Sequence, residues 1–257
     1  AANLAPEPGC PLLGLPIKPY AIRTVRGVRV GIVGLANPDV STLAAACPHT
    51  RFTDSAEALG KAVVELERQG VRHIVAVTHL GLPADRELAR TVDGVDVSVG
   101  GHTHSCLGPN SPEGPYPIVE RSPSGQPVLV VTAKFATEYL GELRVDFDEQ
   151  GVPAHWGGAA KRLEPGIVPA PDVDTRVNDY AKPLEVFRAQ TLGRNDLDFP
   201  DGMEACRKGD CFSGLLTADA FLEYGRKQGA RLALVNGGAI RASLPAGDIS
   251  RGDLLAL

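Results

Sequence analysis

Two apolar segments of the sequence end in histidines. His79 follows Val-Ala-Val-Thr, and His102 and His104 follow the run Val95–Val99 and a pair of glycines. If these runs are parallel strands of one sheet, their carboxyl ends lie at the same edge and the histidines can converge there. Imidazole nitrogens are good ligands for divalent transition metals. The sequence therefore predicts a partial metal site formed by His79, His102 and His104.

Each histidine also has a simpler interpretation. A single histidine at a strand end is more often an ordinary polar residue than a metal ligand, and only the joint pattern favours a site. His49, His73 and His155 lack such a context, so we interpret them as surface or core residues.

Two of the five cysteines, Cys206 and Cys211, are separated by only Arg-Lys-Gly-Asp. This spacing can close a small disulfide loop, which would favour an oxidising compartment. The alternative is a pair of reduced thiols in a turn. Metal binding by the pair is disfavoured, because nothing nearby completes a set of four ligands.

The first part of the chain alternates strands and helices. Apolar runs predict strands and helical spacing predicts helices, in the order 17–25, 28–33, 54–69 (helix), 71–78, 84–92 (helix) and 95–99. This order indicates an α/β fold with a mostly parallel sheet flanked by helices. A long proline-rich loop over 108–124 follows. The segments 127–132, 139–148 and 152–162 then predict an antiparallel extension of the sheet.

Three prolines between residues 163 and 171 predict a linker. Beyond it we expect a long helix over 172–192, a helix over 212–229 and a strand over 232–235. The expected domains are therefore 1–163 and 193–257, joined by a linker and bridging helix over 164–192.

Composition narrows the function classes. The formal charge of −5 over 257 residues argues against a nucleic-acid binder, which needs clustered Lys and Arg. The sequence has no run of about 20 apolar residues, so we expect no membrane span, and residues 1–10 do not resemble a signal peptide.

Two longer motifs carry a family resemblance. Thr78-His79-Leu80-Gly81 and Gly100-Gly101-His102-Thr103-His104 resemble the second half of the calcineurin-like metallophosphoesterase signature. Asn236-Gly237-Gly238-Ala239-Ile240-Arg241 resembles the C-terminal domain of 5'-nucleotidases. Together they resemble the 5'-nucleotidase family, which includes bacterial periplasmic UDP-sugar hydrolases. The resemblance implies a metallophosphoesterase-like mixed sheet flanked by helices, followed by a truncated 5'-nucleotidase C-terminal domain.

The resemblance also implies roles for residues. His79 and His102 would bind one of two divalent metals, Zn or Mn, and His104 would serve the other. The residues that would bind the nucleotide substrate are Arg207, Asn236, Gly238 and Arg241, with Asn3 near the phosphate. The implied reaction is two-metal hydrolysis of nucleoside 5'-phosphates, in the periplasm, in secreted form or at the cell surface.

The chain also departs from the family pattern. It lacks the Asp-x-His, Gly-Asp and Gly-Asn-His motifs that supply the remaining ligands and the catalytic histidine, so we expect these upstream of Ala1 and little activity from this segment alone. Residues 212–216 read Phe-Ser-Gly-Leu-Leu where the family has Asn-Leu-Gly-Asn-Leu, which leaves the start of that helix without its asparagines.

Three alternatives remain open from the sequence. The protein could be a cyclic-nucleotide or UDP-sugar phosphoesterase, a sulfur-oxidation thiohydrolase of the same family, or a non-catalytic nucleotide-binding module. The sequence does not indicate an oligomeric state.

Overall fold

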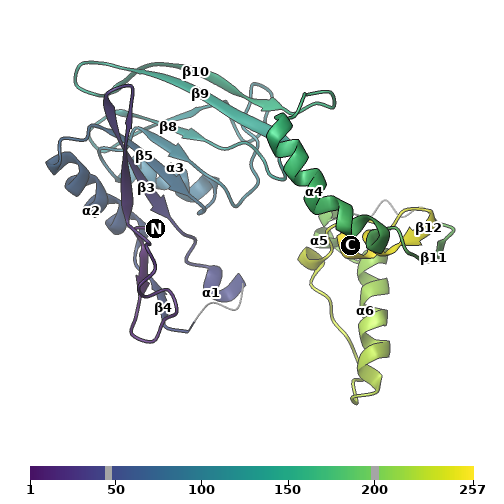
Figure 1. The fold of residues 1–257 in the computed structure, drawn as a ribbon. Coiled ribbons are helices and arrows are strands. Elements are labelled where there is room, and N and C mark those ends of the chain that lie inside the picture. The colour runs from purple at the N-terminus through teal and green to yellow at the C-terminus, as the bar shows by residue number, and fades with distance from the viewer. Residues whose placement is uncertain (44–47, 198–202) are drawn as a thin grey trace. The chain divides into compact units, whose positions relative to one another are not determined.

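The computed structural model describes residues 1–43, 48–197 and 203–257, so Cys47 lies outside the described residues. The chain divides into two units, Ala1–Ile167 and Val168–Leu257 (Figure 1). Each unit is described separately below.

A six-stranded sheet organises the first unit. Its strand order is β2-β3-β5-β6-β8-β7, in which β3, β5, β6 and β8 run parallel and the edge strands β2 and β7 run antiparallel to their neighbours. The bounds are β2 Tyr20–Val25, β3 Val28–Leu35, β5 His73–Thr78, β6 Val97–Val99, β7 Ile118–Arg121 and β8 Pro127–Val131. The α/β class and the mixed sheet predicted from the sequence are confirmed.

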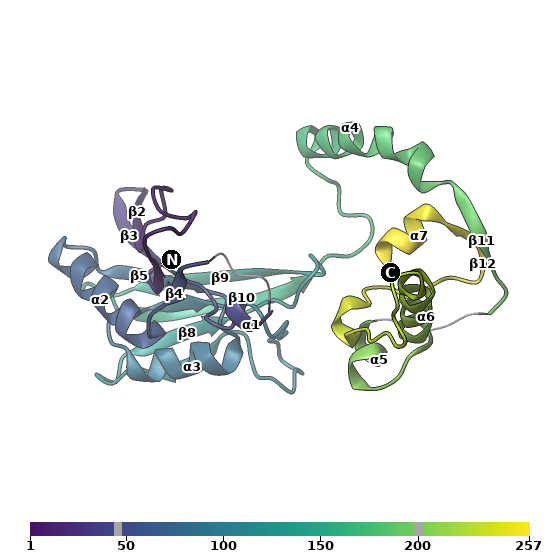
Figure 2. The ribbon, with the colours of Figure 1, turned by 90° about the horizontal axis from the view of Figure 1, so that it is seen from below.

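Two helices, α2 (Ser55–Arg68) and α3 (Leu82–Thr91), cover one face of this sheet (Figure 2). The Asp54 side chain caps α2 by accepting a hydrogen bond from the Glu57 amide at 2.8 Å. Apolar residues at helical spacing, Leu59, Ala62, Val63 and Leu66, then pack against the sheet. Parallel strands usually need cover on both faces, and here the helices supply one of them.

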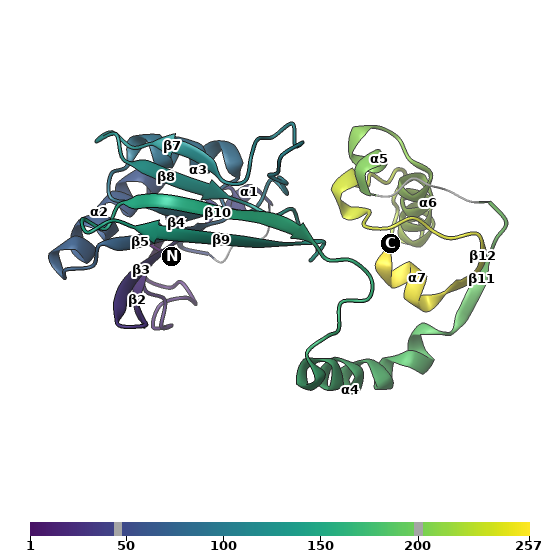
Figure 3. The same ribbon diagram turned by 90° about the horizontal axis from the view of Figure 1, so that it is seen from above.

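A long hairpin, β9 (Tyr139–Phe147) and β10 (Pro153–Arg162), lies over the other face of the sheet (Figure 3). Leu143 and Val145 pack against Val97 and Val131. Between hairpin and sheet lies an open groove of about 920 Å³, lined largely by apolar side chains that include Val75, Val99, Leu143 and Phe147. The hairpin therefore covers this face only in part.

Shorter elements complete the first unit: β1 (Leu4–Pro6) pairs with β4 (Thr50–Phe52), and α1 spans Val40–Leu43. In the second unit, β11 pairs antiparallel with β12. The bounds there are α4 Pro171–Arg188, β11 Thr191–Asn195, α5 Met203–Lys208, α6 Phe212–Arg226, the 3-10 turn η1 Gly237–Ala239, β12 Gly247–Ser250 and α7 Arg251–Ala256.

Several expected elements differ from those observed. The hairpin β9–β10 is a separate sheet and not an extension of the main one, because its strands pair only with each other among the described residues. The proline-rich loop contains strand β7, which begins directly after Pro117. The expected helix over 172–192 ends at Arg188, and β11 follows it. The predicted strand over 232–235 is irregular, and Leu232 and Leu234 are exposed, so burial does not favour a strand there.

Within the described residues, no helix is both long and apolar enough to cross a membrane.

Candidate metal and anion sites

His79 and His102 lie together at the carboxyl edge of the main sheet. Strands β5 and β6 are parallel neighbours, with Val77 opposite Val99, so the segments that follow them leave the sheet side by side. The two imidazole rings meet edge to face, with centroids 5.2 Å apart. His79 is exposed and His102 half-buried, so the pair is open to a ligand.

The loop that carries His102 is a tight turn. His102 has a φ of 79°, and the Thr103 amide donates to the Gly101 carbonyl at 3.1 Å. A Cβ at Gly101 would lie 3.1 Å from Nδ1 of His79, so glycine lets this backbone approach the neighbouring ring. The Thr103 hydroxyl oxygen accepts a hydrogen bond from the Leu82 amide at 3.1 Å, which ties the turn to the start of α3.

His104 takes a different position. Its φ is 56°, and its ring stacks on Phe135 with centroids 4.1 Å apart and an interplanar angle of 13°. Across residues 1–43, 48–197 and 203–257, no group of three or more His, Cys, Asp or Glu side chains is arranged to hold a metal ion. The structure thus brings His79 and His102 together as a pair and does not add His104 as a third member.

A divalent metal fits this pair only in part. Two neighbouring imidazoles at an open sheet edge are a suitable donor set for Zn or Mn, but four ligands are needed to close a tetrahedral site. The pair would supply at most two of those four ligands.

A buried carboxyl group, which sequence reasoning missed, contacts both strand ends that lead to the pair. Asp85 is 1% exposed, and its Oδ1 accepts a hydrogen bond from the hydroxyl of Thr78, the residue before His79. Burial raises the pKa of Asp85 to about 6, against the lowering effect of the Thr78 hydrogen bond. The signal was available: Asp85 occupies a position three residues after Leu82 and four before Ala89, on the buried face of α3.

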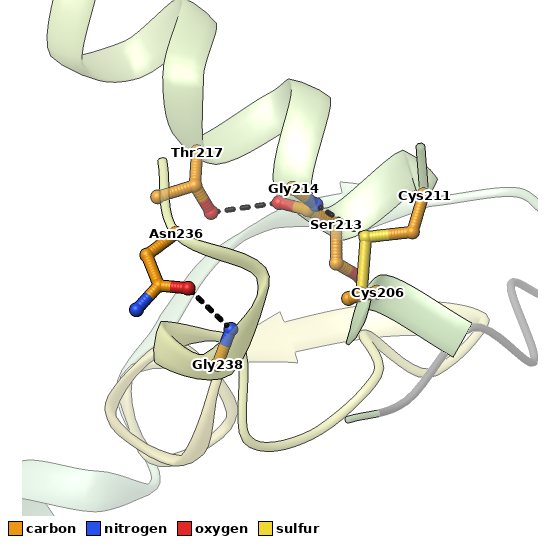
Figure 4. The surroundings of a disulfide bond; sticks show 7 residues. All are labelled: Cys206, Cys211, Ser213, Gly214, Thr217, Asn236 and Gly238. Atoms are coloured by element: carbon orange, nitrogen blue, oxygen red, sulfur yellow. Dashed lines mark hydrogen bonds between the residues drawn. A yellow bond between two sulfur atoms is a disulfide. The ribbon is translucent and has the colours of Figure 1, made fainter. Parts of the chain in front are cut away.

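In the second unit, Cys206 and Cys211 form the predicted disulfide (Figure 4). Cys211 is also the N-cap of α6, where its sulfur accepts a hydrogen bond from the Gly214 amide at 3.2 Å. The cysteine sulfur thus caps the helix start that lacks the family's asparagines. One residue both closes the loop and starts the helix.

The Asn236-Gly237-Gly238 segment packs directly on this loop. The Asn236 side-chain oxygen accepts from the Gly238 amide at 3.1 Å (Figure 4). A Cβ at Gly237 would lie 2.0 Å from the Cys206 carbonyl oxygen, and one at Gly238 would lie 3.8 Å from Nε of Arg207. Glycine is therefore required at 237, and the structure brings Arg207, Asn236 and Gly238 together. A cavity of about 480 Å³ borders Arg207, Lys208 and Gly237.

The other two predicted substrate residues differ from each other. Arg241 is exposed and follows Ile240, which is 2% exposed and packs with both disulfide cysteines, so the arginine leaves the same cluster. Asn3 is fully buried: its amide nitrogen donates to the Ala36 carbonyl at 2.7 Å and the Ser55 hydroxyl at 3.2 Å, and its oxygen accepts from the Ala36 amide. These contacts join the residue before β1 to the residue after β3 and to the start of α2, and a role of Asn3 at a phosphate stays a prediction.

Comparison with known proteins gives consistent matches. Residues 191–257 match the family model described as 5'-nucleotidase, C-terminal domain. The chain is 34% identical over 241 residues to the snake venom 5'-nucleotidase of Gloydius brevicauda, covering 89% of this chain and 41% of that protein. The structure of a 5'-nucleotidase precursor from Thermus thermophilus superposes with a TM-score of 0.88 at 37% identity, over all of this chain and 52% of that one.

A sulfate thiohydrolase from Thermus thermophilus matches more weakly, with a TM-score of 0.60 at 20% identity over 76% of this chain and 34% of that one, which shows likeness of fold alone. The chain spans less than half of the length of the curated snake venom relative and about half of the Thermus 5'-nucleotidase precursor.

Proposed function

The chain belongs to the 5'-nucleotidase family, and from this premise we propose that it supplies half of a two-metal centre that hydrolyses nucleoside 5'-phosphates or related nucleotide phosphoesters with release of phosphate. The observation that carries the proposal is the His79–His102 pair at adjacent parallel strand ends. The family relatives support the substrate class.

In this proposal His79 and His102 hold one metal, Zn or Mn, and His104 serves the second. Such metals, when bound, polarise the phosphoryl group and lower the pKa of the attacking water. The residues of this chain provide the preorganisation: the tight turn at Gly101 fixes the approach of one imidazole to the other, and the stack on Phe135 fixes the plane of the His104 ring.

The second unit is proposed to bind the nucleotide. Arg207 lies beside the Asn236–Gly238 turn, and a guanidinium group binds phosphate oxygens in a bidentate manner. Arg241 lies two residues after the turn, next to Ile240, which packs against the disulfide. The disulfide, which anchors this cluster, supports a location outside the reducing cytoplasm, in the periplasm, secreted or at the cell surface.

The test is phosphate release from AMP with Mn²⁺ or Zn²⁺, measured for the protein expressed from its whole gene. His102→Ala should lower kcat/KM by more than the roughly 100-fold that loss of an outer-shell partner costs. His155→Ala, on the exposed side of β10, is the matched control and should leave kcat/KM unchanged. Equal turnover in the two variants would contradict the metal assignment.

A panel of esters separates the alternatives. AMP, a cyclic nucleotide, a UDP-sugar and a thiol S-sulfonate are assayed side by side. Preference for the nucleoside 5'-phosphate supports the proposal. Nucleotide binding by the whole gene product without turnover of any ester would instead identify a non-catalytic binding module.

A further inference from the structure

The carboxyl group of Asp85 occupies the space between the two histidine-bearing strand ends. Asp85 lies in the first turn of α3, which begins three residues after His79. It is 1% exposed, so its surroundings are protein and not water. A carboxyl group is rarely buried without partners, and this one has two neighbours of interest.

The first neighbour is on the β5 side. Oδ1 of Asp85 accepts a hydrogen bond from the hydroxyl of Thr78, the last residue of β5. This contact fixes the end of the strand immediately before His79. The helix and the strand end are thereby joined by a side-chain contact at the point where the chain leaves the sheet.

The second neighbour is on the β6 side. Oδ2 of Asp85 has no hydrogen-bond partner among the described residues, and it faces the Cα of Gly100: a Cβ there would lie 1.9 Å from this oxygen. Gly100 directly follows β6 and precedes His102 by two residues. Its amide is already used, since it donates to the Val131 carbonyl at 2.9 Å. The oxygen thus makes steric contact with the backbone of the second loop.

We propose that Asp85 is a positioning residue that sets the separation of His79 and His102, by bonding the strand end before the first and packing against the glycine before the second. The link between this role and metal binding rests on the proposed function, which assigns the two histidines to a metal. A competing interpretation makes Asp85 an ordinary acidic residue in the first turn of a helix, where the helix dipole favours it. That interpretation predicts loss of stability but no change in the histidine pair.

The test is made on the 257-residue chain by NMR, without metal, from the nuclear Overhauser effect between the ring protons of His79 and His102. Asp85→Ala and the isosteric Thr78→Val each remove the hydrogen bond and should weaken or abolish this effect. Thr78→Ser and Asp85→Asn keep a donor and an acceptor and should retain it. Glu87→Gln, on the exposed side of α3, is the control.

An unchanged effect in folded Asp85→Ala or Thr78→Val chains would overturn the proposal, as would its absence in the unsubstituted chain. If Asp85→Ala does not fold, Thr78→Val carries the test. Titration with Zn²⁺ is the second arm: the dissociation constant read from the histidine shifts should rise at least about 10-fold in Thr78→Val and stay unchanged in Thr78→Ser. A ring contact without any Zn²⁺-induced shift would contradict the metal assignment and leave the positioning role intact.

Discussion

Several non-glycine residues in and beside the loop of His102 and His104 have a positive φ, a backbone conformation that favours glycine. His102 and His104 have φ values of 79° and 56°, and Lys134, Ala136 and Thr137, which flank Phe135, lie between 54° and 58°. Each such residue costs roughly 1–2 kcal/mol, so the surrounding packing must hold them in place. Strain of this kind often accompanies functional sites.

Gly100 is the residue at which a single methyl group should be most damaging to the histidine pair. A Cβ there would lie 1.9 Å from Oδ2 of Asp85, so Gly100→Ala must displace either the carboxyl group or the loop. We expect a loss of about 1–3 kcal/mol in the free energy of unfolding, measured with urea. Gly108→Ala is the control, because no atom lies within 4 Å of its added Cβ. Equal losses in the two variants would contradict the close approach.

Asp96 should make stability depend on pH. Burial raises its pKa to about 7, Glu67 adds to the rise, and the hydrogen bond from the Ile74 amide at 2.7 Å opposes it. The folded chain therefore holds a proton that the unfolded chain has lost above its ordinary pKa. The resulting stability is fully present below about pH 4 and is lost as the pH rises through about 7, by up to roughly 4 kcal/mol.

Asp96→Asn keeps an acceptor for the Ile74 amide and cannot ionise. Urea unfolding at pH 5, 6.5 and 8 should show a smaller fall in stability for this variant than for the unsubstituted chain, with the remaining fall due in part to Asp85. Asp93→Asn is the control, because hydrogen bonds from Ser124 and Ser122 lower the pKa of Asp93, which puts its titration below this range. Identical slopes in the Asp96 and Asp93 variants would contradict the assignment.

At the scale of single residues, the sequence predicted correctly which histidines lie together when their position is set by the end of a strand. His79 and His102 converge because two apolar runs became parallel neighbours. The contact between His104 and Phe135 depends on a loop from a distant segment, which periodicity does not report. Asp85 was missed because a charged residue is expected on the exposed side of a helix.

At the scale of elements, the start of α6 depends on one residue with two roles. The sulfur of Cys211 bonds Cys206 and accepts from the Gly214 amide. A substitution of Cys211 therefore removes the disulfide and the helix cap together, and its effect on stability does not separate the two contributions. Two double variants separate the effects.

Cys206→Ala/Cys211→Ser and Cys206→Ala/Cys211→Ala both lack the disulfide and differ only in the capping atom. Serine is a strong N-cap and alanine a poor one, so the serine variant should stabilise the first turn of α6 by about 1 kcal/mol. Hydrogen exchange of the Gly214 amide measures this directly and should be about fivefold slower in the serine variant. Equal exchange rates would show that the cap contributes nothing.

The elements predicted with least error are those that bury a periodic apolar face. Helix α2 begins and ends within one residue of its predicted bounds, because Asp54 caps it and four core residues define its inner side. The predicted strand over 232–235 failed because an apolar run becomes a strand only where a partner edge exists, and the described residues provide none. Strand β9 pairs with β10 and not with the main sheet. Alternation of apolar and polar residues predicts a strand but does not identify its partner.

At the scale of the whole first unit, the groove under the β9–β10 hairpin is an exposed apolar surface. Val99 and Val28 line this groove and are 40% and 46% exposed, on a sheet whose opposite face is packed by helices. Contiguous exposed apolar surfaces of this kind mark binding grooves or interaction sites.

The 257-residue chain should therefore bind the dye ANS in this groove with increased fluorescence. Leu143 lines the groove, whereas Leu140 of the same strand does not. Leu143→Ser should lower the fluorescence and Leu140→Ser should not, although Leu140 is the more exposed of the two. A larger loss in the Leu140 variant would locate the dye elsewhere.

The contact between Thr78 and Asp85 also has a consequence for how the chain folds. Its partners are 7 residues apart, and both histidines lie within or beside the single β5-α3-β6 crossover. The contacts of Asn3 join residues 33 and 52 positions apart and must close much longer loops. The histidine pair thus depends on one local stretch, residues 73–102, which can acquire its geometry before the chain's first strand has docked.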